Sequence, residues 1–417
     1  MKVKVISRNP DDYLRETKND IFKTPRNYDP ALHPFQQSRE YVRALNAAKL
    51  ERVFAKPFLA SLDGHLDGLN CLSKHPSHLS ILLSGSFDGQ VKLWNVTQKK
   101  CLSTINAHAG FVRGICTDPT GETFFTVGDD KCVKQWPLQE TVEPDEPLLT
   151  LLSKYPLQDI THHWKDAVFA TCGEGVSIWD QEHSSPIRSF VWGVDTIYKV
   201  RFNPVECVMK LKSNAVAWNP VEAFTFTVAN EDYNLYTFDM RRMSTPVNVH
   251  MDHTEAVMDV DYSPTGQEFV SGGYDKVVRI FRANAGRSRE VYHTKRMQRV
   301  RCVLWSSDDR YILSGSDEMN IRLWKARASE KLGPLHIREK RAFEYAEKLK
   351  DKYRYHPEVN RILRHRQVPK HVYNARNELR AIHESHRRKE ANLRLHSAPG
   401  TVPYISERAK HVVGEEQ

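Results

Sequence analysis

The stretch "LLSGSFDGQVKLWN", residues 82–95, has the pattern of a β-hairpin. An apolar run leads into a tight Asp-Gly turn, and a second strand of alternating apolar residues closes on Trp94. The pattern returns as "FFTVGDDKCVKQWP" (124–137), "VFATCGEGVSIWD" (168–180), "TFTVANEDYNLYTFD" (225–239), "FVSGGYDKVVRIFR" (269–282) and "ILSGSDEMNIRLWK" (312–325). The closing aromatic residues lie 42, 43, 59, 43 and 43 residues apart, so the chain repeats with one irregular interval.

The length of the repeat indicates the fold. Four short strands in a unit of about 40–45 residues are typical of one β-propeller blade. Three copies also share a histidine, an aspartate and an aromatic residue at nearly constant spacing: His65, Asp88 and Trp94; His108, Asp130 and Trp136; His253, Asp275 and Phe281. On these residues, segment 58–324 resembles the WD-repeat proteins. The resemblance implies a hydrogen-bonded set inside each blade, with Ser84, Thr126 and Ser271 as the hydroxyl members.

Histidine, aspartate and serine also form the triads of hydrolases. A catalytic triad occurs once, whereas a bond inside a blade must be remade in every repeat, so the recurrence favours a structural role. The sequence has no phosphate-cradling glycine loop, no nucleophile elbow and no metal-ligand cluster; the adjacent His162 and His163 are more typical of a solvent-facing loop than of a metal site. We therefore predict no enzyme, no catalytic, cofactor-binding or metal-binding residue, and no small-molecule substrate.

The irregular interval contains a repeated phrase. "FNPVE" at residues 202–206 returns as "WNPVE" at residues 218–222, and each ends a run with the pattern of a strand that opens a blade. The irregular interval is thus one full unit plus a stub of sixteen residues. If about 27 residues were restored there, the span from Trp94 to Trp324 would hold almost six periods, and six intervals between closing aromatic residues correspond to seven blades. We predict an all-β WD40 β-propeller of the seven-blade type, with six complete blade signatures and most of blade four missing near residues 206–214. A genuine six-blade propeller is the alternative.

The two ends of the chain differ from the repeats in charge. Residues 1–57 carry a formal charge of +5 and residues 325–417 carry +10, whereas residues 58–324 carry −6. We predict an N-terminal arm with a helix in 1–57, the propeller in 58–324, and a basic α-helical domain in 325–417. The asymmetry favours a polyanionic partner, with a solvated helical appendage as the alternative.

The strongest positive charge lies in residues 361–394, where ten Lys and Arg face three Glu. Phosphate contacts by such a surface need no particular base sequence and weaken with salt. The predicted contacts to RNA or another polyanion are Arg361, Arg364, Arg366, Lys370, Arg387, Arg388 and Lys389.

Phrases outside the repeats narrow the resemblance. "SRNPDDYLRETKNDIFKTPRNYDPALHPF" (7–35), "RHRQVPKHVY" (364–373), "HRRKEANLRLHS" (386–397) and "PGTVPYISERAKHVV" (399–413) closely resemble the suppressor-of-fibrillarin WD-repeat proteins. That resemblance implies a non-catalytic scaffold of the small-subunit processome in the nucleolus. Its implied partners are pre-ribosomal RNA, the U3 small nucleolar ribonucleoprotein and other processome proteins, and its role is in the early cleavages that lead to 18S rRNA.

The resemblance also implies an alternative function. Animal members of the family are described as substrate receptors of cullin-4 ubiquitin ligases, which commonly show a Trp/Tyr-Asp-x-Arg tetrapeptide at the close of a blade. This sequence has Phe238-Asp239-Met240-Arg241, so Phe238, Asp239 and Arg241 would contact the ligase adaptor. The plainer interpretation is that Asp239 and Arg241 end a strand at the surface. No apolar run approaches 18 residues, so we expect no membrane partner.

Overall fold

The computed structural model describes residues 31, 35–138, 146–181, 183–191, 196–202, 207–398, 400–406 and 408–415. By their contacts the residues group into two compact units, one made of 1–56 with 328–365 and the other of 57–327 with 366–417. The three-part division of the sequence stays a prediction, because the compact units have other limits. Most of the N-terminal phrase at 7–35, and residues 203–206 next to the predicted break, lie outside the described residues.

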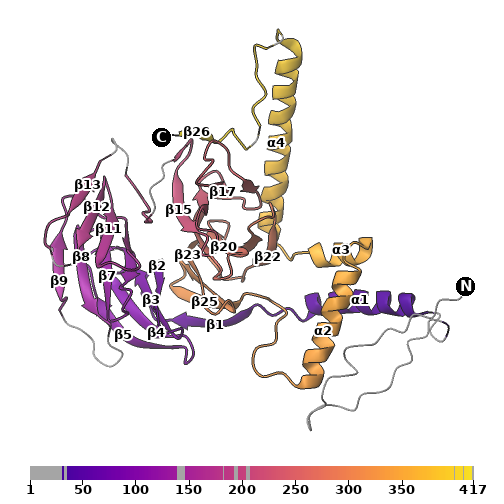
Figure 1. Ribbon diagram of the computed structural model, residues 1–417, viewed down its shortest axis with the longest axis horizontal. Coiled ribbons are helices and arrows are strands. Elements are labelled where there is room, and N and C mark those ends of the chain that lie inside the picture. The colour runs from indigo at the N-terminus through magenta and orange to yellow at the C-terminus, as the bar shows by residue number, and fades with distance from the viewer. Residues whose placement is uncertain are drawn as a thin grey trace, which may run out of the picture. The chain divides into compact units, whose positions relative to one another are not determined.

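Six antiparallel four-stranded sheets form the propeller of the second unit (Figure 1). In hydrogen-bonding order their strands are β2 (Leu69–Lys74), β3 (Ile81–Ser86), β4 (Gln90–Asn95) and β5 (Lys100–Asn106); β6 (Val112–Thr117), β7 (Thr123–Gly128), β8 (Cys132–Pro137) and β9 (Leu149–Leu152); β10 (Asp159–His162), β11 (Val168–Cys172), β12 (Val176–Asp180) and β13 (Arg188–Phe190); β15 (Ser213–Trp218), β16 (Thr225–Asn230), β17 (Leu235–Asp239) and β18 (Asn248–His250); β19 (Val257–Tyr262), β20 (Glu268–Gly273), β21 (Val278–Arg282) and β22 (Ser288–Tyr292); and β1 (Phe58–Asp63), β25 (Asn320–Lys325), β24 (Tyr311–Ser316) and β23 (Val300–Trp305). The six predicted hairpins are the central strand pairs of these sheets, and the predicted WD40 β-propeller with six blade signatures is confirmed.

The tight turns of the hairpins follow from local chemistry. Asp88 accepts a hydrogen bond from the backbone N–H of Gln90 (2.9 Å), which holds the β3–β4 turn. Gly89 has a φ of +81°, and a Cβ atom there would lie 2.2 Å from the carbonyl oxygen of His108. Only glycine fits this position, because a side chain would collide with the backbone of the next blade.

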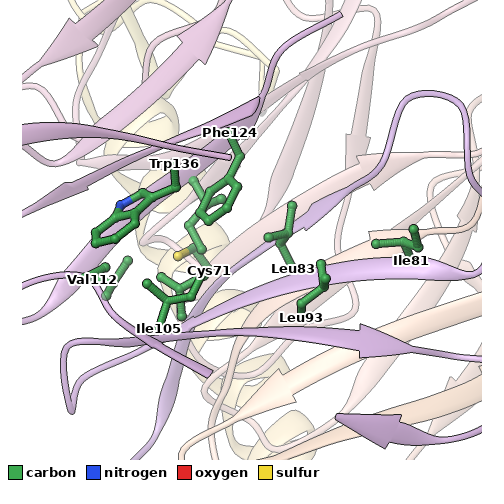
Figure 2. Packing of buried hydrophobic residues seen from close by; sticks show 11 residues of the cluster. Cys71, Ile81, Leu83, Leu93, Ile105, Val112, Phe124 and Trp136 are labelled. Carbon is green, nitrogen blue, oxygen red and sulfur yellow. The ribbon is translucent and has the colours of Figure 1, made fainter. Parts of the chain in front are cut away.

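Neighbouring sheets bury their apolar faces against each other. Figure 2 shows Phe124 and Trp136 of the β6–β9 sheet in one cluster with Cys71 and Leu83 of the β2–β5 sheet. Ile81 and Leu83 of β3 belong to this cluster, whereas Leu82 between them belongs to the cluster on the other face of the sheet, as the period of two along a strand predicts. Burial of each large apolar side chain contributes about 1.5–3 kcal/mol, so packing between blades stabilises the propeller.

The first and last strands of the propeller are joined in one sheet, but the ring of packed inner strands is interrupted at another point. Strand β1 pairs with β25, so the first and last strands of the propeller share a sheet. The inner strands pack in the order β15, β19, β23, β2, β6, β10, but in the described part of the chain β10 and β15 do not pack against each other in this way. Between them β14 (Cys207–Met209) pairs with β26 (Val412–Glu415), near the C-terminus (Figure 1).

The other compact unit contains α1 (Gln36–Val53), α2 (Ile337–Lys352) and α3 (Pro357–Arg364). Helix α1 packs against α2 and α3, and Lys350 Nζ lies 2.6 Å from Glu51 Oε2. Ala44 and Ala48 of α1 are buried, whereas Val53 at its end is 73% exposed. The predicted N-terminal helix therefore buries its face of small residues.

Helix α4 (Lys370–His396) belongs to the propeller unit. Val372 near its start is buried against Val277 and Val291 of the β19–β22 sheet. With α2 and α3 it makes the C-terminal region helical, as predicted. None of the described helices combines the length and the apolar composition needed to cross a bilayer.

Candidate functional site

The predicted histidine, aspartate and aromatic sets lie inside the sheets. His108 Nδ1 is 2.9 Å from Asp130, its Nε2 is 2.9 Å from Thr126 Oγ1, and the Trp136 indole N–H donates to Thr126 at 3.2 Å. The other two sets have equivalent partners. In the first, Ser84 lies 2.7 Å from His65 and 2.8 Å from the Trp94 indole nitrogen, and Asp88 lies 3.9 Å from His65. In the last, His253 lies 2.9 Å from Asp275 and 2.7 Å from Ser271. Each set joins a loop to its own hairpin, and Phe281 completes the last set by packing its ring against His253, with ring centroids 6.1 Å apart, instead of by a hydrogen bond.

Burial lowers the pKa of three histidines in these sheets, His65, His108 and His250. It lowers the pKa of His65 to about 4, and the nearby Asp88 only partly opposes it. Burial also lowers the pKa of His108 and lowers that of His250, in the β15–β18 sheet, to about 4. These rings are therefore neutral at pH 7 and act as hydrogen-bonding links. Within the described ranges, no three His, Cys, Asp or Glu side chains are grouped so that they could hold a metal ion.

The tetrapeptide at 238–241 divides into a buried and an exposed part. Phe238 is fully buried and stacks on Phe226, with ring centroids 5.6 Å apart. Asp239 accepts two hydrogen bonds from the guanidinium of Arg241, at 3.2 and 3.1 Å, and a third from its backbone N–H at 3.0 Å. Arg241 is 65% exposed and lies 4.0 Å above the ring of Phe224. The structure thus holds one guanidinium in a single orientation at the surface.

The predicted polyanion contacts are divided between the two compact units. Arg361 and Arg364 lie on α3, in the unit of residues 1–56 and 328–365, whereas Arg366 and Lys370 belong to the propeller unit. Arg387, Arg388 and Lys389 follow one another on α4 and are exposed. Among the predicted contacts, these three are therefore neighbouring cations that face solvent on one helix.

Arg366 differs from the other predicted contacts because it is bound by the protein. Its Nη1 lies 2.8 Å from Asp252 Oδ2 and donates to the carbonyl and hydroxyl oxygens of Ser288 at 2.5 and 2.8 Å. Arg376 of α4 approaches the other oxygen of Asp252 at 3.3 Å. Burial alone would raise the pKa of Asp252, but the charges of Arg279 and Arg366 outweigh it and hold the pKa below its usual value.

The role of Asp252 was not visible in the sequence. It stands between two histidines in "HMDHTE" and is separated from Arg366 by 114 residues, so no local pattern connects them. Phe224, which supports Arg241, belongs to another turn and was likewise missed. The one hint in the sequence is an acidic residue just before the opening strand of a blade, in a chain whose C-terminal region is strongly basic.

Comparisons with known proteins agree with this architecture. Residues 326–412 match the Sof1-like domain family, and residues 56–95, 99–137, 244–282 and 289–325 match the WD domain, G-beta repeat. The chain is similar to "DDB1- and CUL4-associated factor 13" from Xenopus laevis (57% identity over 441 residues) and Homo sapiens (58% over 441), covering 99% of each chain. It is also similar to "Protein SOF1" of Saccharomyces cerevisiae, 41% identical over 466 residues, covering 99% of this chain and 95% of that protein.

A solved structure shares the propeller fold. The WD40 β-propeller domain of Doa1 superposes with a TM-score of 0.55 over 64% of this chain and 96% of that domain. The sequence identity is 19%, so this likeness concerns the fold alone.

Proposed function

The chain belongs to the Sof1-like family of WD-repeat proteins, and on that premise we propose that it is a non-catalytic scaffold of the small-subunit processome. In this role it acts in the nucleolus with the U3 small nucleolar ribonucleoprotein, other processome proteins and pre-ribosomal RNA, in the cleavages that lead to 18S rRNA. The propeller supplies rigid surfaces for protein partners, and the basic C-terminal region contacts RNA.

The observation that carries this proposal is the exposed run Arg387, Arg388 and Lys389 on a helix fixed to the propeller. Asp252 binds Arg366 and Arg376, so the start of α4 is attached to the β19–β22 sheet by a buried ion pair. Cations on a fixed helix contact phosphates without an ordering cost at the moment of binding. Exposed cations contribute affinity that does not depend on base sequence and that falls steeply with salt.

The test is charge reversal on α4 in the full chain. The triple variant with Arg387, Arg388 and Lys389 each changed to Glu should lose U3 and pre-ribosomal RNA from a nuclear-extract pull-down. The matched control reverses Arg338, Lys340 and Lys348, which are exposed on α2, and so changes the net charge equally. If both variants recover RNA like the unchanged protein, α4 is not the RNA contact; if both lose it equally, only the net charge matters.

A second candidate function is that of a substrate receptor for a cullin-4 ubiquitin ligase. Relatives from frog and human carry the name "DDB1- and CUL4-associated factor 13", and the oriented, exposed guanidinium of Arg241 supports the same role here. Arg241→Ala should abolish binding of purified adaptor while RNA recovery is unchanged. Arg282→Ala is the control, because Arg282 is an exposed arginine at the end of the third strand of the neighbouring sheet, whereas Arg241 lies two residues beyond the third strand of its own. Equal adaptor binding by both variants would rule out the contact.

We further infer that the six sheets derive from a seven-blade propeller that lacks most of blade four. The alignments with the frog and human relatives run over 441 residues, whereas this chain has 417. The segment around Ile197 and Arg201 supports the inference, because it lies beside β10, where the opening strand of a next blade would run. Ile197 donates its N–H to the carbonyl of Gly173 (2.7 Å), and Arg201 Nη1 lies 2.6 Å from Asp159 of β10. A chain with about 27 restored residues should unfold at a higher temperature; a lower temperature would favour a genuine six-blade ring.

A further inference from the structure

One end of the propeller carries a continuous row of alternating arginine and aromatic side chains. The row, called here the Arg-aromatic row, consists of Arg113, Phe111, Phe87, Arg301, Tyr274 and Arg299. The Arg113 guanidinium lies 5.3 Å from the Phe111 ring centroid, and the Phe111 and Phe87 rings meet edge to face at 4.9 Å. Arg301 lies 4.9 Å from Phe87 and 5.9 Å from Tyr274, and Arg299 lies 4.9 Å from Tyr274.

The row crosses four consecutive sheets at the same end of their strands. Phe87 and Tyr274 stand in turns between the second and third strands, whereas Phe111 and Arg299 directly precede inner strands. In each of these four sheets the turn donates a backbone N–H to the loop before the inner strand, from Phe87 to Gly68, Asp129 to Phe111, Tyr274 to Ala256 and Asp317 to Arg299, at 3.0–3.2 Å. Gly68 permits the crossing between two sheets, because a Cβ atom there would lie 3.3 Å from Phe87 and 3.2 Å from the backbone of Asp317.

Two members of the row are held in place by acids of their own sheets. Arg113 makes a bidentate pair with Asp129, at 2.7 and 2.9 Å, and Arg301 Nε lies 2.6 Å from Asp317. These pairs fix the guanidinium planes against the rings, and the carboxylates neutralise the charges of the two arginines. The surface is therefore preorganised, and its middle is nearly neutral in spite of the arginines.

The two ends of the row differ. Towards one end, next to the paired Arg113, Phe111 is 42% exposed. At the other end Arg299 is exposed, and among the described residues it has no ion pair with a carboxylate; the exposed Lys295 and Arg296 lie in the same loop. One end thus offers an apolar contact and the other offers unpaired positive charge.

We propose that the Arg-aromatic row is a docking surface for a protein segment that places a carboxylate against Arg299 and a large apolar side chain against Phe111. Rigid Phe, Tyr and Arg side chains are typical of the energetic centres of protein interfaces. A polyanion such as RNA fits less well, because Asp129 and Asp317 neutralise Arg113 and Arg301 and so leave the middle of the row with little net positive charge for phosphates. The surface lies at the opposite end of the strands from Arg241, so both can be occupied at once.

The experiment selects ligands from a phage-displayed library of random peptides of about 12 residues on the full chain. Enriched peptides should contain Asp or Glu close to an aromatic or large aliphatic residue. A synthetic peptide with the enriched motif should lose about tenfold or more in affinity on Phe111→Ala and on Arg299→Glu, measured by fluorescence anisotropy. Both changes are at exposed positions, and circular dichroism verifies that each variant is folded.

Trp164→Ala is the matched control. Trp164 is 72% exposed and forms its own cation-π contact with Lys165 (4.4 Å), but in a turn between first and second strands, at the other end of the propeller. This variant should bind the peptide like the unchanged chain. Failure to enrich any motif, equal binding by the Phe111→Ala and Arg299→Glu variants, or displacement of the peptide by a single-stranded RNA of the same length would each overturn the proposal, the last in favour of an RNA site.

Discussion

The guanidinium of Arg366 lies 2.8 Å from the carboxylate of Asp252, a side chain with no exposed surface, although the two residues are 114 positions apart. This pair connects the basic C-terminal region to the β19–β22 sheet. The ion pair of Asp252 with Arg366 and the packing of Val372 on Val277 and Val291 together hold the start of α4 against this sheet.

Asp252→Ala should lower the free energy of unfolding by about 3–5 kcal/mol, because Arg366 would lose its counter-charge and the buried Arg279 would keep only Asp275, 3.7 Å away. Hydrogen exchange should also become faster in the first turns of α4. Urea denaturation and exchange mass spectrometry measure the two effects. Glu378→Ala, at an exposed position on the same helix, is the control; an Asp252 variant as stable as this control would contradict the anchoring role.

Stability should fall as the pH is lowered from about 6.5 towards 4. An unfolded histidine takes up a proton near pH 6.5, whereas His65 and His250 do so in the folded chain only at about 4, because burial lowers the pKa of each ring. The unfolded state therefore binds more protons in this window, which costs on the order of 3 kcal/mol for each ring. Urea midpoints at several pH values between 7.5 and 4.5 test this; His250→Gln should flatten the curve, whereas the exposed His386→Gln should not.

Trp94→Phe should cost about 1 kcal/mol and Trp94→Ala about 3–5 kcal/mol. The first change removes the hydrogen bond to Ser84 (2.8 Å) and the smaller part of the ring packing, whereas the second removes the whole ring and leaves a cavity between two blades. Phe281 already occupies the equivalent place in another sheet, so a phenyl ring is compatible with the site. Thermal denaturation gives both values, and the exposed Trp164→Ala sets the baseline. Equal losses for Phe and Ala would show that packing contributes nothing there.

Truncation after Ser406 should destabilise the β15–β18 sheet by about 2 kcal/mol, the scale of one buried aliphatic side chain. The deletion removes β26, whose Val412 packs with Met209 on the cluster around Phe238, and the 3.1 Å pair of His411 with Asp232. Hydrogen exchange should rise in β14 and β15. Arg408→Ala, an exposed point change in the same segment, is the control. Unchanged exchange after truncation would mean that β26 does not protect this sheet.

Much of the fold could be predicted because its signals are local. Each hairpin needs an apolar alternation, a turn acid or glycine and a closing aromatic, and all three stand within about 15 residues. The hydroxyl partners Ser84, Thr126 and Ser271 came from the resemblance to the WD-repeat proteins, carried over onto the same repeats. The β13 strand and the pairing of β14 with β26 had no such signal, because three- or four-residue strands have too few positions to show a period.

The candidate sites were harder to predict, because charge alone does not tell whether a cation is free. Arg366 and Arg387 look alike in the sequence, yet the first is bound to Asp252 and the second faces solvent. The Arg-aromatic row was invisible for the same reason, since its members come from four repeats and meet only when the blades stand side by side.

The sequence by itself determined the period, the hairpins and therefore the propeller, together with the basic character of both ends. These properties depend on neighbours along the chain, whose spacing the covalent backbone sets. Only the tertiary structure decided which arginines are paired, where α4 is attached, and that Phe87, Phe111 and Tyr274 belong to one surface. Such relations depend on distances between residues far apart in sequence, which only the packing of the blades determines.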